Sequence, residues 1–298
     1  MQMYVGVTDK TQYELLKKEQ CSEVNFWTPG NANFRAIREN DIFLFKLHSP
    51  DDYIVGGGYF VHFSILPTHL AWTIFGKKNG ANSLPEFYEK ITKYRNKNGI
   101  LKESPQIGCI ILTDAFYFDE KDWIPIPENW NRNIVSGKTY NEKDVYGKTL
   151  YEAVKQRLGE KAHPDNRNAN PLFQHEIGDG AFQAMVTDAY QKRCAITGEP
   201  VLPILQATHI KPPAAGGTNT VNNGLLLKSD FRMLFDAGYI TVDWHYRVKV
   251  SKRLCQDYGG GEMYYAYQDR QLLLIPDQIM HLPLREYLEW HNENVFLG

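Results

Sequence analysis

One segment in the C-terminal half constrains the fold more than any other part of the chain. It runs L-Q-A-T-H-I-K-P over 205–212, then a polar loop rich in Gly and Asn, then N-N-G-L-L-L-K-S-D-F-R-M-L-F-D over 222–236. His209 ends a strand-like stretch, and Asn223 closes the loop fourteen residues later. A short helix with several charged residues follows. More broadly, residues 194–238 predict strand, turn, strand, loop and helix in that order.

These residue types in this order suit cleavage of a phosphodiester bond. The histidine would take a proton from water, the asparagine would hydrogen-bond across the loop and orient the histidine, and the helix would hold a divalent cation against the phosphate. Each piece alone is weak evidence. A single histidine in a strand is usually structural, an Asn-Gly pair is usually a turn, and L-F-D-A-G fits a plain helix end capped by Gly238. The ordered combination is much more specific.

Residues 190–245, which begin Y-Q-K-R-C-A-I-T-G, resemble the HNH endonuclease family and its pattern of HI-P, NG-L-L, D and LFD-G. The likeness continues through E-Y-L-E-W-H-N-E-N-V-F near the C-terminus. It implies a ββα-metal nuclease domain. In that domain His209 takes the position of the general base and Asn223 that of the middle asparagine.

The sequence departs from the family pattern at two positions. The third letter of the HNH motif falls on Arg232, which cannot ligate a metal while protonated, and the residue before the base is Thr208. We therefore expect Asp230 first and Asp236 second as carboxylate ligands, with Arg232 on the scissile phosphate. The expected ion is Mg²⁺ or Mn²⁺, with Ni²⁺ or Co²⁺ as the alternative.

The cysteines and the C-terminus raise two further questions about the site. The four cysteines form no CxxC pair, so we expect neither a structural zinc nor a disulfide framework. His291 and Asn292 either complete the catalytic site or dock the last helix, and we favour docking.

The N-terminal half has a different pattern. Residues 24–75 are rich in aromatic and β-branched residues, with Gly56, Gly57 and Gly58 inside strand-like sequence, which indicates a bulge or a close backbone approach. Apolar spacing predicts a helix over 84–95, and strand-like sequence returns over 107–118. The fold class is thus α+β, with a small, mostly β barrel or curled sheet first and the ββα-metal domain second.

Four motifs in this half carry a second resemblance: V-N-F-W-T-P-G (24–30), D-I-F-L-F-K-L (41–47), I-V-G-G-G-Y-F (54–60) and A-W-T-I-F-G-K-K-N-G-A (71–81). They resemble the N-terminal modules of the PUA superfamily, which includes the EVE and YTH readers, as fused to HNH domains in modification-dependent (type IV) restriction enzymes. Such a module holds a flipped base between aromatic faces. The aromatic candidates are Trp27, Tyr59, Trp72 and Phe75, and the candidates for flanking phosphates are Lys46, Lys77 and Lys78.

Charge gives mixed evidence on a nucleic-acid partner. The net charge of −2 counts mildly against one, whereas residues 77–102 carry seven basic and two acidic residues, a stretch that suits a phosphate backbone or a solvated helix face. No apolar run is long enough to span a bilayer and no signal peptide is evident, so we expect a soluble, cytoplasmic protein without a membrane partner.

Together these features predict a base-reading domain over 1–160, a polar linker over 161–171 and a nuclease domain over 172–298. The expected function is restriction of double-stranded DNA that carries modified bases, chiefly modified cytosine, in phage defence. Two alternatives stay open: a non-enzymatic nucleic-acid-binding regulator with an inert HNH fold, and an HNH endonuclease whose first domain reads sequence or RNA. Whether the protein forms a homodimer also stays open.

Overall fold

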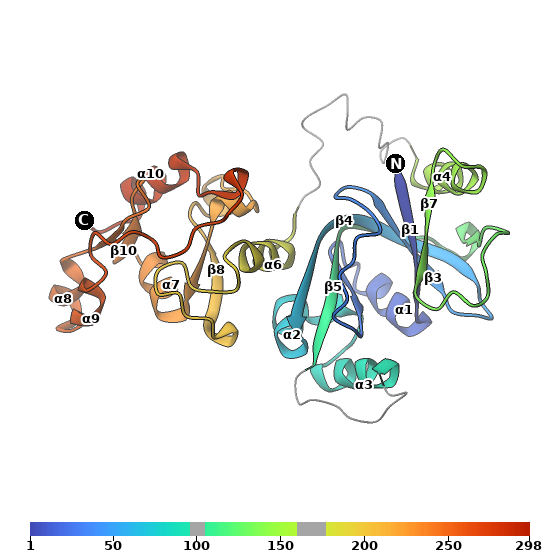
Figure 1. Ribbon diagram of the computed structural model, residues 1–298, viewed down its shortest axis with the longest axis horizontal. Helices are drawn as coiled ribbons and strands as arrows, with labels where there is room; N and C mark the ends of the chain where they lie inside the picture. Colours follow the sequence, from blue (N-terminus) through green and yellow to red (C-terminus); the bar gives the residue numbers. More distant parts are fainter. Residues whose placement is uncertain (96–104, 160–176) are drawn as a thin grey trace. The chain divides into compact units, whose positions relative to one another are not determined.

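A computed structural model describes residues 1–95, 105–159 and 177–298. The chain divides into two compact units, Met1–Ala181 and Phe182–Gly298, which are described one at a time (Figure 1). The predicted linker over 161–171 lies outside the described residues, so the domain boundaries drawn around it stay a prediction. None of the described helices combines the length and the apolar character needed to cross a membrane.

A seven-stranded mixed sheet forms the first unit. Its strands are β1 (Gln2–Thr8), β2 (Val24–Thr28), β3 (Ile42–Leu47), β4 (Tyr53–Pro67), β5 (Gln106–Tyr117), β6 (Ile124–Pro125) and β7 (Gly137–Asn141). They pair in the order β2-β5-β4-β3-β1-β7, with β6 added beside β4, and β1 and β3 are parallel. Within the described residues this order is open at β2 and β7, so the pairing does not close a barrel.

The glycine triplet lets the sheet bend where β4 lies between two neighbours. The register of β4 against β5 shifts between Gly57 and Tyr59, as a bulge does. A Cβ on Gly56 would lie 2.3 Å from the Phe116 carbonyl oxygen, and one on Gly57 would lie 2.4 Å from that of Phe43. Both predicted features, the bulge and the close backbone approach, are therefore present.

Helices and short turns pack around this sheet (Figure 1). They are α1 (Lys10–Lys18), α2 (Thr68–Phe75), the 3₁₀ turn η1 (Gly76–Asn79), α3 (Leu84–Arg95), η2 (Glu120–Asp122) and α4 (Val145–Leu158). α3 has the bounds that the apolar spacing predicts, and its Phe87 and Ile91 are fully buried. The α+β class is confirmed.

The second unit is smaller and has two short hairpins. Helix α6 (Asp179–Ala189) leads into it, and its own elements are η4 (Leu202–Ile204), β8 (Leu205–His209), η5 (Pro213–Ala215), η6 (Val221–Asn223), β9 (Gly224–Lys228), α7 (Ser229–Asp236), β10 (Ile240–Val242), β11 (Val248–Val250), α8 (Arg253–Tyr258), α9 (Glu262–Tyr265), η7 (Ile279–His281) and α10 (Arg285–Asn294). β8 pairs antiparallel with β9, and α7 follows directly, which is a ββα arrangement.

The predicted element order is wrong in one place. Cys194–Gly198 forms a turn, closed by a 2.9 Å bond from Gly198 N to Cys194 O, whereas the strand that pairs with β8 comes after the loop. Leu225, Leu226 and Leu227 are all fully buried, so this strand has no alternation to mark it. A short continuous apolar run of this kind fits either a strand or a helix.

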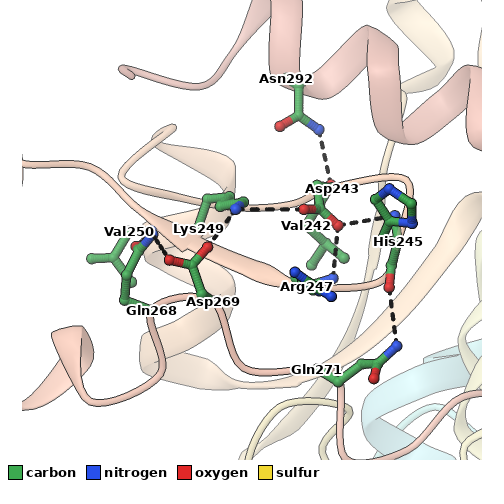
Figure 2. Close-up of polar contacts among 10 residues, drawn as sticks. All are labelled: Val242, Asp243, His245, Arg247, Lys249, Val250, Gln268, Asp269, Gln271 and Asn292. Atoms are coloured by element: carbon green, nitrogen blue, oxygen red, sulfur yellow. Dashed lines mark hydrogen bonds and ion pairs between the residues drawn. The ribbon is translucent and has the colours of Figure 1, made fainter.

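Polar contacts fix the β10–β11 hairpin against its surroundings (Figure 2). The Asp243 carboxylate accepts bonds of 2.9 Å from the backbone N–H groups of His245 and Arg247. Lys249 forms ion pairs with both Asp243 and Asp269. Asn292 on α10 donates to the Val242 carbonyl oxygen at 2.8 Å, so the last helix is tied to this hairpin.

His291 anchors the same helix from its buried face. Its ring stacks on Phe235 at 3.8 Å between centroids, Nε2 lies 3.1 Å from the Phe235 carbonyl oxygen, and Nδ1 lies 2.8 Å from Thr241 Oγ1. The carbonyl requires a proton on Nε2, so the neutral ring accepts from Thr241 through Nδ1. These contacts support the docking interpretation of His291.

We predict that His291 makes the protein sensitive to acid. Burial lowers its pKa from 6.5 to about 4, so the folded state binds fewer protons than the unfolded state between these values. This difference contributes up to about 3 kcal/mol to the free energy of unfolding. The contribution of His291 is complete above pH 6.5 and is lost as the pH falls towards 4. Denaturant unfolding at several pH values measures it. A His291→Gln variant should be less stable at neutral pH but show a flatter dependence, and an unchanged slope would contradict the assignment.

Candidate active site

His209 lies at the end of β8, where its ring is held on one face and at one nitrogen. The ring stacks on Phe182, with 3.9 Å between centroids and 5° between planes. Nε2 lies 2.7 Å from Oδ1 of Asn219. An amide oxygen only accepts hydrogen bonds, so the proton sits on Nε2 and Nδ1 keeps its lone pair. A neutral imidazole in this state can take a proton.

Asn223 closes the loop between β8 and β9. Its Oδ1 accepts from Lys211 N at 2.9 Å, and its Nδ2 donates to the carbonyl oxygens of Lys211 at 2.8 Å and Thr218 at 2.9 Å. The side chain is fully buried. Loss of the amide would leave three backbone groups without partners, at about 1–3 kcal/mol for each group that stays buried.

The loop reaches this closed form because its backbone passes close to itself. A Cβ on Gly217 would lie 1.8 Å from the Lys211 carbonyl oxygen, a distance that any other residue type would have to relieve by moving the backbone. The predicted bond across the loop is thus formed by Asn223, while the contact to the histidine ring comes from Asn219.

Helix α7 carries three charged side chains, and two of them, Arg232 and Asp236, contact β8. Asp236 accepts a 2.7 Å bond from the Thr208 hydroxyl, next to His209 in sequence. Arg232 Nε lies 3.1 Å from Asp236 Oδ2, and Arg232 Nη1 donates to Gln206 Oε1 at 2.7 Å. Asp230, at the start of the helix, pairs with Lys228 at 3.1 Å and accepts from the Tyr264 hydroxyl at 3.2 Å.

These contacts bear on the expected metal ion. Within the described residues, no three His, Cys, Asp or Glu side chains are grouped as a metal cage. Mg²⁺ commonly binds through one or two carboxylates, with water and substrate phosphate completing its shell. A half-exposed carboxylate such as that of Asp236 fits this smaller requirement, although it also faces the guanidinium of Arg232.

The seven candidates in the first unit differ in accessibility. Trp27, Tyr59 and Phe75 are buried, whereas Trp72 is half-buried on α2. Lys46 is buried and pairs with Asp52, while the more exposed Lys77 and Lys78 pair with Glu19 and Glu23. Of the basic stretch, Lys97 and Lys102 lie outside the described residues.

Two contacts of the site were not predicted from the sequence. Asn219 is one of several amides in a polar loop, and only the loop's closure by Asn223 brings it to the His209 ring. Phe182 belongs to the apolar stripe of α6, which gives no sign that one member stacks on the histidine. A search for amides inside the His–Asn interval would have found Asn219 and Asn222.

Residues 194–243 match a family model, HNH_2, described as HNH endonuclease. The matched segment contains His209, Asn223 and all three charged residues of α7. The resemblance predicted for the C-terminal half is confirmed, and the chain carries an HNH endonuclease domain. Comparison with curated protein sequences gives no match.

Solved structures show more distant likenesses. The crystal structure of ASCH from Zymomonas mobilis is 9% identical and covers 50% of this chain and 94% of its own, with a TM-score of 0.37. A structure titled modification dependent TagI restriction endonuclease is 12% identical and covers 93% of this chain and 76% of its own, with a TM-score of 0.31. Both TM-scores are low.

We predict that Asn219 orients the His209 ring through its acceptor oxygen. Replacement by leucine should slow DNA cleavage by about tenfold, since it removes part of a general-base contribution of about 10²–10⁴. Asn219→Asp keeps an acceptor oxygen at the same place, so it should cleave faster than Asn219→Leu. Equal rates for Asn219→Leu and wild type would show that residue 219 does not act on the base.

Proposed function

We propose that this protein is a modification-dependent DNA endonuclease. In this proposal the first unit binds a modified base, a modified cytosine such as 5-methylcytosine or 5-hydroxymethylcytosine, and the HNH domain hydrolyses a phosphodiester bond of the same duplex. The observation that carries the nuclease half is the oriented His209 ring, with a bonded Nε2 and a lone pair on Nδ1, inside the segment that matches the HNH family.

The proposed chemistry begins at Nδ1 of His209, which takes a proton from the water that attacks the phosphorus. The bond from phosphorus to the leaving sugar oxygen breaks, and that oxygen takes a proton from solvent water. The ring then carries a positive charge, and the Asn219 oxygen stabilises it through the Nε2–H bond. Phe182 keeps the ring plane fixed during this transfer. Arg232 suits a non-bridging phosphate oxygen, because its planar fork matches phosphate geometry.

Asp236 is the carboxylate that we propose for the divalent ion, ahead of Asp230. Its bond to Thr208 ties it to the residue beside the base, whereas Asp230 lies at the other end of α7, where its Oδ2 contacts Lys228 and Tyr264 and its Oδ1 has no hydrogen-bond partner among the described residues. Mg²⁺ or Mn²⁺, when bound, would offset the negative charge that builds up on the phosphate. A divalent ion that binds Asp236 would displace Arg232 from that carboxylate. The released guanidinium would then bind the substrate phosphate.

Selectivity for modified DNA has to come from outside this site. Phosphate contacts position a protein on DNA but carry no sequence information directly. In the first unit, Trp72 on α2 is followed by Lys77 and Lys78 on η1, so an accessible ring and two cations lie on consecutive elements. This is the combination that base stacking and phosphate binding require, and we propose it as part of the reading surface.

His209→Ala should reduce cleavage of modified DNA by about 10²–10⁴-fold, because it removes the general base. The matched control is His245→Ala, which removes an exposed histidine of the same unit and should cut at the wild-type rate. Nicking of a 5-hydroxymethylcytosine plasmid in Mg²⁺ measures both, with an EDTA reaction that should show no product. A His209→Ala rate within about tenfold of wild type would refute the assignment.

The second test concerns the reader. Full-length His209→Ala should bind a duplex with a modified cytosine more tightly than the unmodified duplex. Trp72→Ala in that background should remove about 1–3 kcal/mol of this binding, the usual contribution of one stacked base. Fluorescence anisotropy on matched duplexes measures the difference.

Tyr146→Ala, an exposed aromatic on α4, is the control and should change nothing. Equal affinity of the His209→Ala protein for modified and unmodified duplexes would contradict the hypothesis that the first unit reads modified bases. It would favour a first unit that recognises sequence or RNA.

A further inference from the structure

A short turn in the second unit presents two apolar side chains to solvent. Ile279 is 87% exposed and Met280 is 73% exposed, both on η7. The turn is closed by backbone bonds from His281 N to Gln278 O at 2.9 Å and from Leu282 N to Ile279 O at 3.2 Å. Pro276 and Pro283 flank it and restrict the backbone on both sides. The two side chains therefore stand on a turn whose backbone is restrained.

This turn is attached to the loop of the nuclease site. Just after it, Leu284 N donates to the Asn222 carbonyl oxygen at 3.0 Å, beside the loop-closing Asn223. The Tyr287 hydroxyl lies 3.2 Å from that of Thr218, the residue before Asn219. Two hydrogen bonds thus join the segment after the turn to the loop that also carries Asn219, the residue that contacts His209.

Cationic side chains lie on the segments next to the turn. Arg285 follows it at the start of α10, exposed, with its guanidinium 4.6 Å from the Trp244 ring and paired with Glu289. Lys211, on the site loop, has its ammonium 5.8 Å from the Trp290 ring. Asp277 and Glu286 are exposed on the same segments, so Arg285 and Lys211 are the groups that would meet phosphates if the apolar tip entered a duplex.

We propose that Ile279 and Met280 form a wedge that enters the base stack of duplex DNA beside the scissile phosphate. The inference rests on the proposed function. Isoleucine and methionine are among the side chains that proteins insert between base steps, and the resulting kink is offset by wider contact with the backbone. A wedge here would bend the duplex towards the loop that carries His209, and Arg285 would meet a flanking phosphate.

The test compares Ile279→Ala/Met280→Ala with wild type and with Met263→Ala, which removes a 62% exposed methionine on α9. The probe is a short 5-hydroxymethylcytosine duplex with 2-aminopurine, whose fluorescence rises on unstacking, at steps around the cut. A second duplex carries a mismatch at the same step. Fluorescence is read in EDTA and cleavage in Mg²⁺.

Wild type and Met263→Ala should raise the fluorescence, and the double variant should not. The double variant should cut the matched duplex at least about tenfold more slowly. It should cut the mismatched duplex at close to the wild-type rate, because a mispaired base costs less to unstack. Melting temperature and sedimentation should not change, because both side chains are exposed in the isolated chain.

Three results would overturn the wedge: equal fluorescence and cleavage for all three proteins, a lowered melting temperature that shows the tip to be covered, or loss of a dimer that shows it to be an interface between copies. A wild type that unstacks the duplex but never cuts it would contradict the proposed function and leave the wedge standing. A wild type that binds neither duplex would contradict both.

Discussion

The buried amide of Asn223 satisfies three backbone groups at once and so sets the course of the loop between β8 and β9. Buried polar backbone groups must find partners, and the Asn223 amide supplies them at Lys211 and Thr218. Because Asn223 draws Lys211 and Thr218 together, Asn219 comes within hydrogen-bond distance of His209. The orientation of the His209 ring therefore depends on a residue that does not need to touch the substrate.

The departure from the HNH pattern at Arg232 is consistent with the rest of the site. The guanidinium lies against Asp236 and Gln206, so a cation occupies the third position of the HNH motif. Binding of a phosphate gives Arg232 an alternative partner and frees Asp236 for an ion. Binding of substrate would then favour binding of the metal ion, and the reverse. A metal site built only from protein ligands does not need this coupling.

Much of this could be predicted from the sequence, for physical reasons. The spacing from His209 to Asn223 and the apolar period of 84–95 identified the loop and α3, because both depend on local geometry. The strand Gly224–Lys228 was harder to predict from the sequence, since a run of buried leucines shows no alternation of apolar and polar residues. The roles of Asn219 and Phe182 depend on tertiary contacts, which no local pattern encodes. Burial of Trp27 and Phe75 likewise follows from the packed sheet.

The central claim is that one chain joins a base reader to an HNH nuclease. The most direct measurement is the cleavage rate of the wild-type enzyme in Mg²⁺ on three plasmids of identical sequence, containing cytosine, 5-methylcytosine or 5-hydroxymethylcytosine. We expect at least one modified plasmid to be cut and the unmodified plasmid to be left intact. Equal cutting of all three would show that the first unit does not read modification, and no cutting of any would contradict the proposed nuclease function.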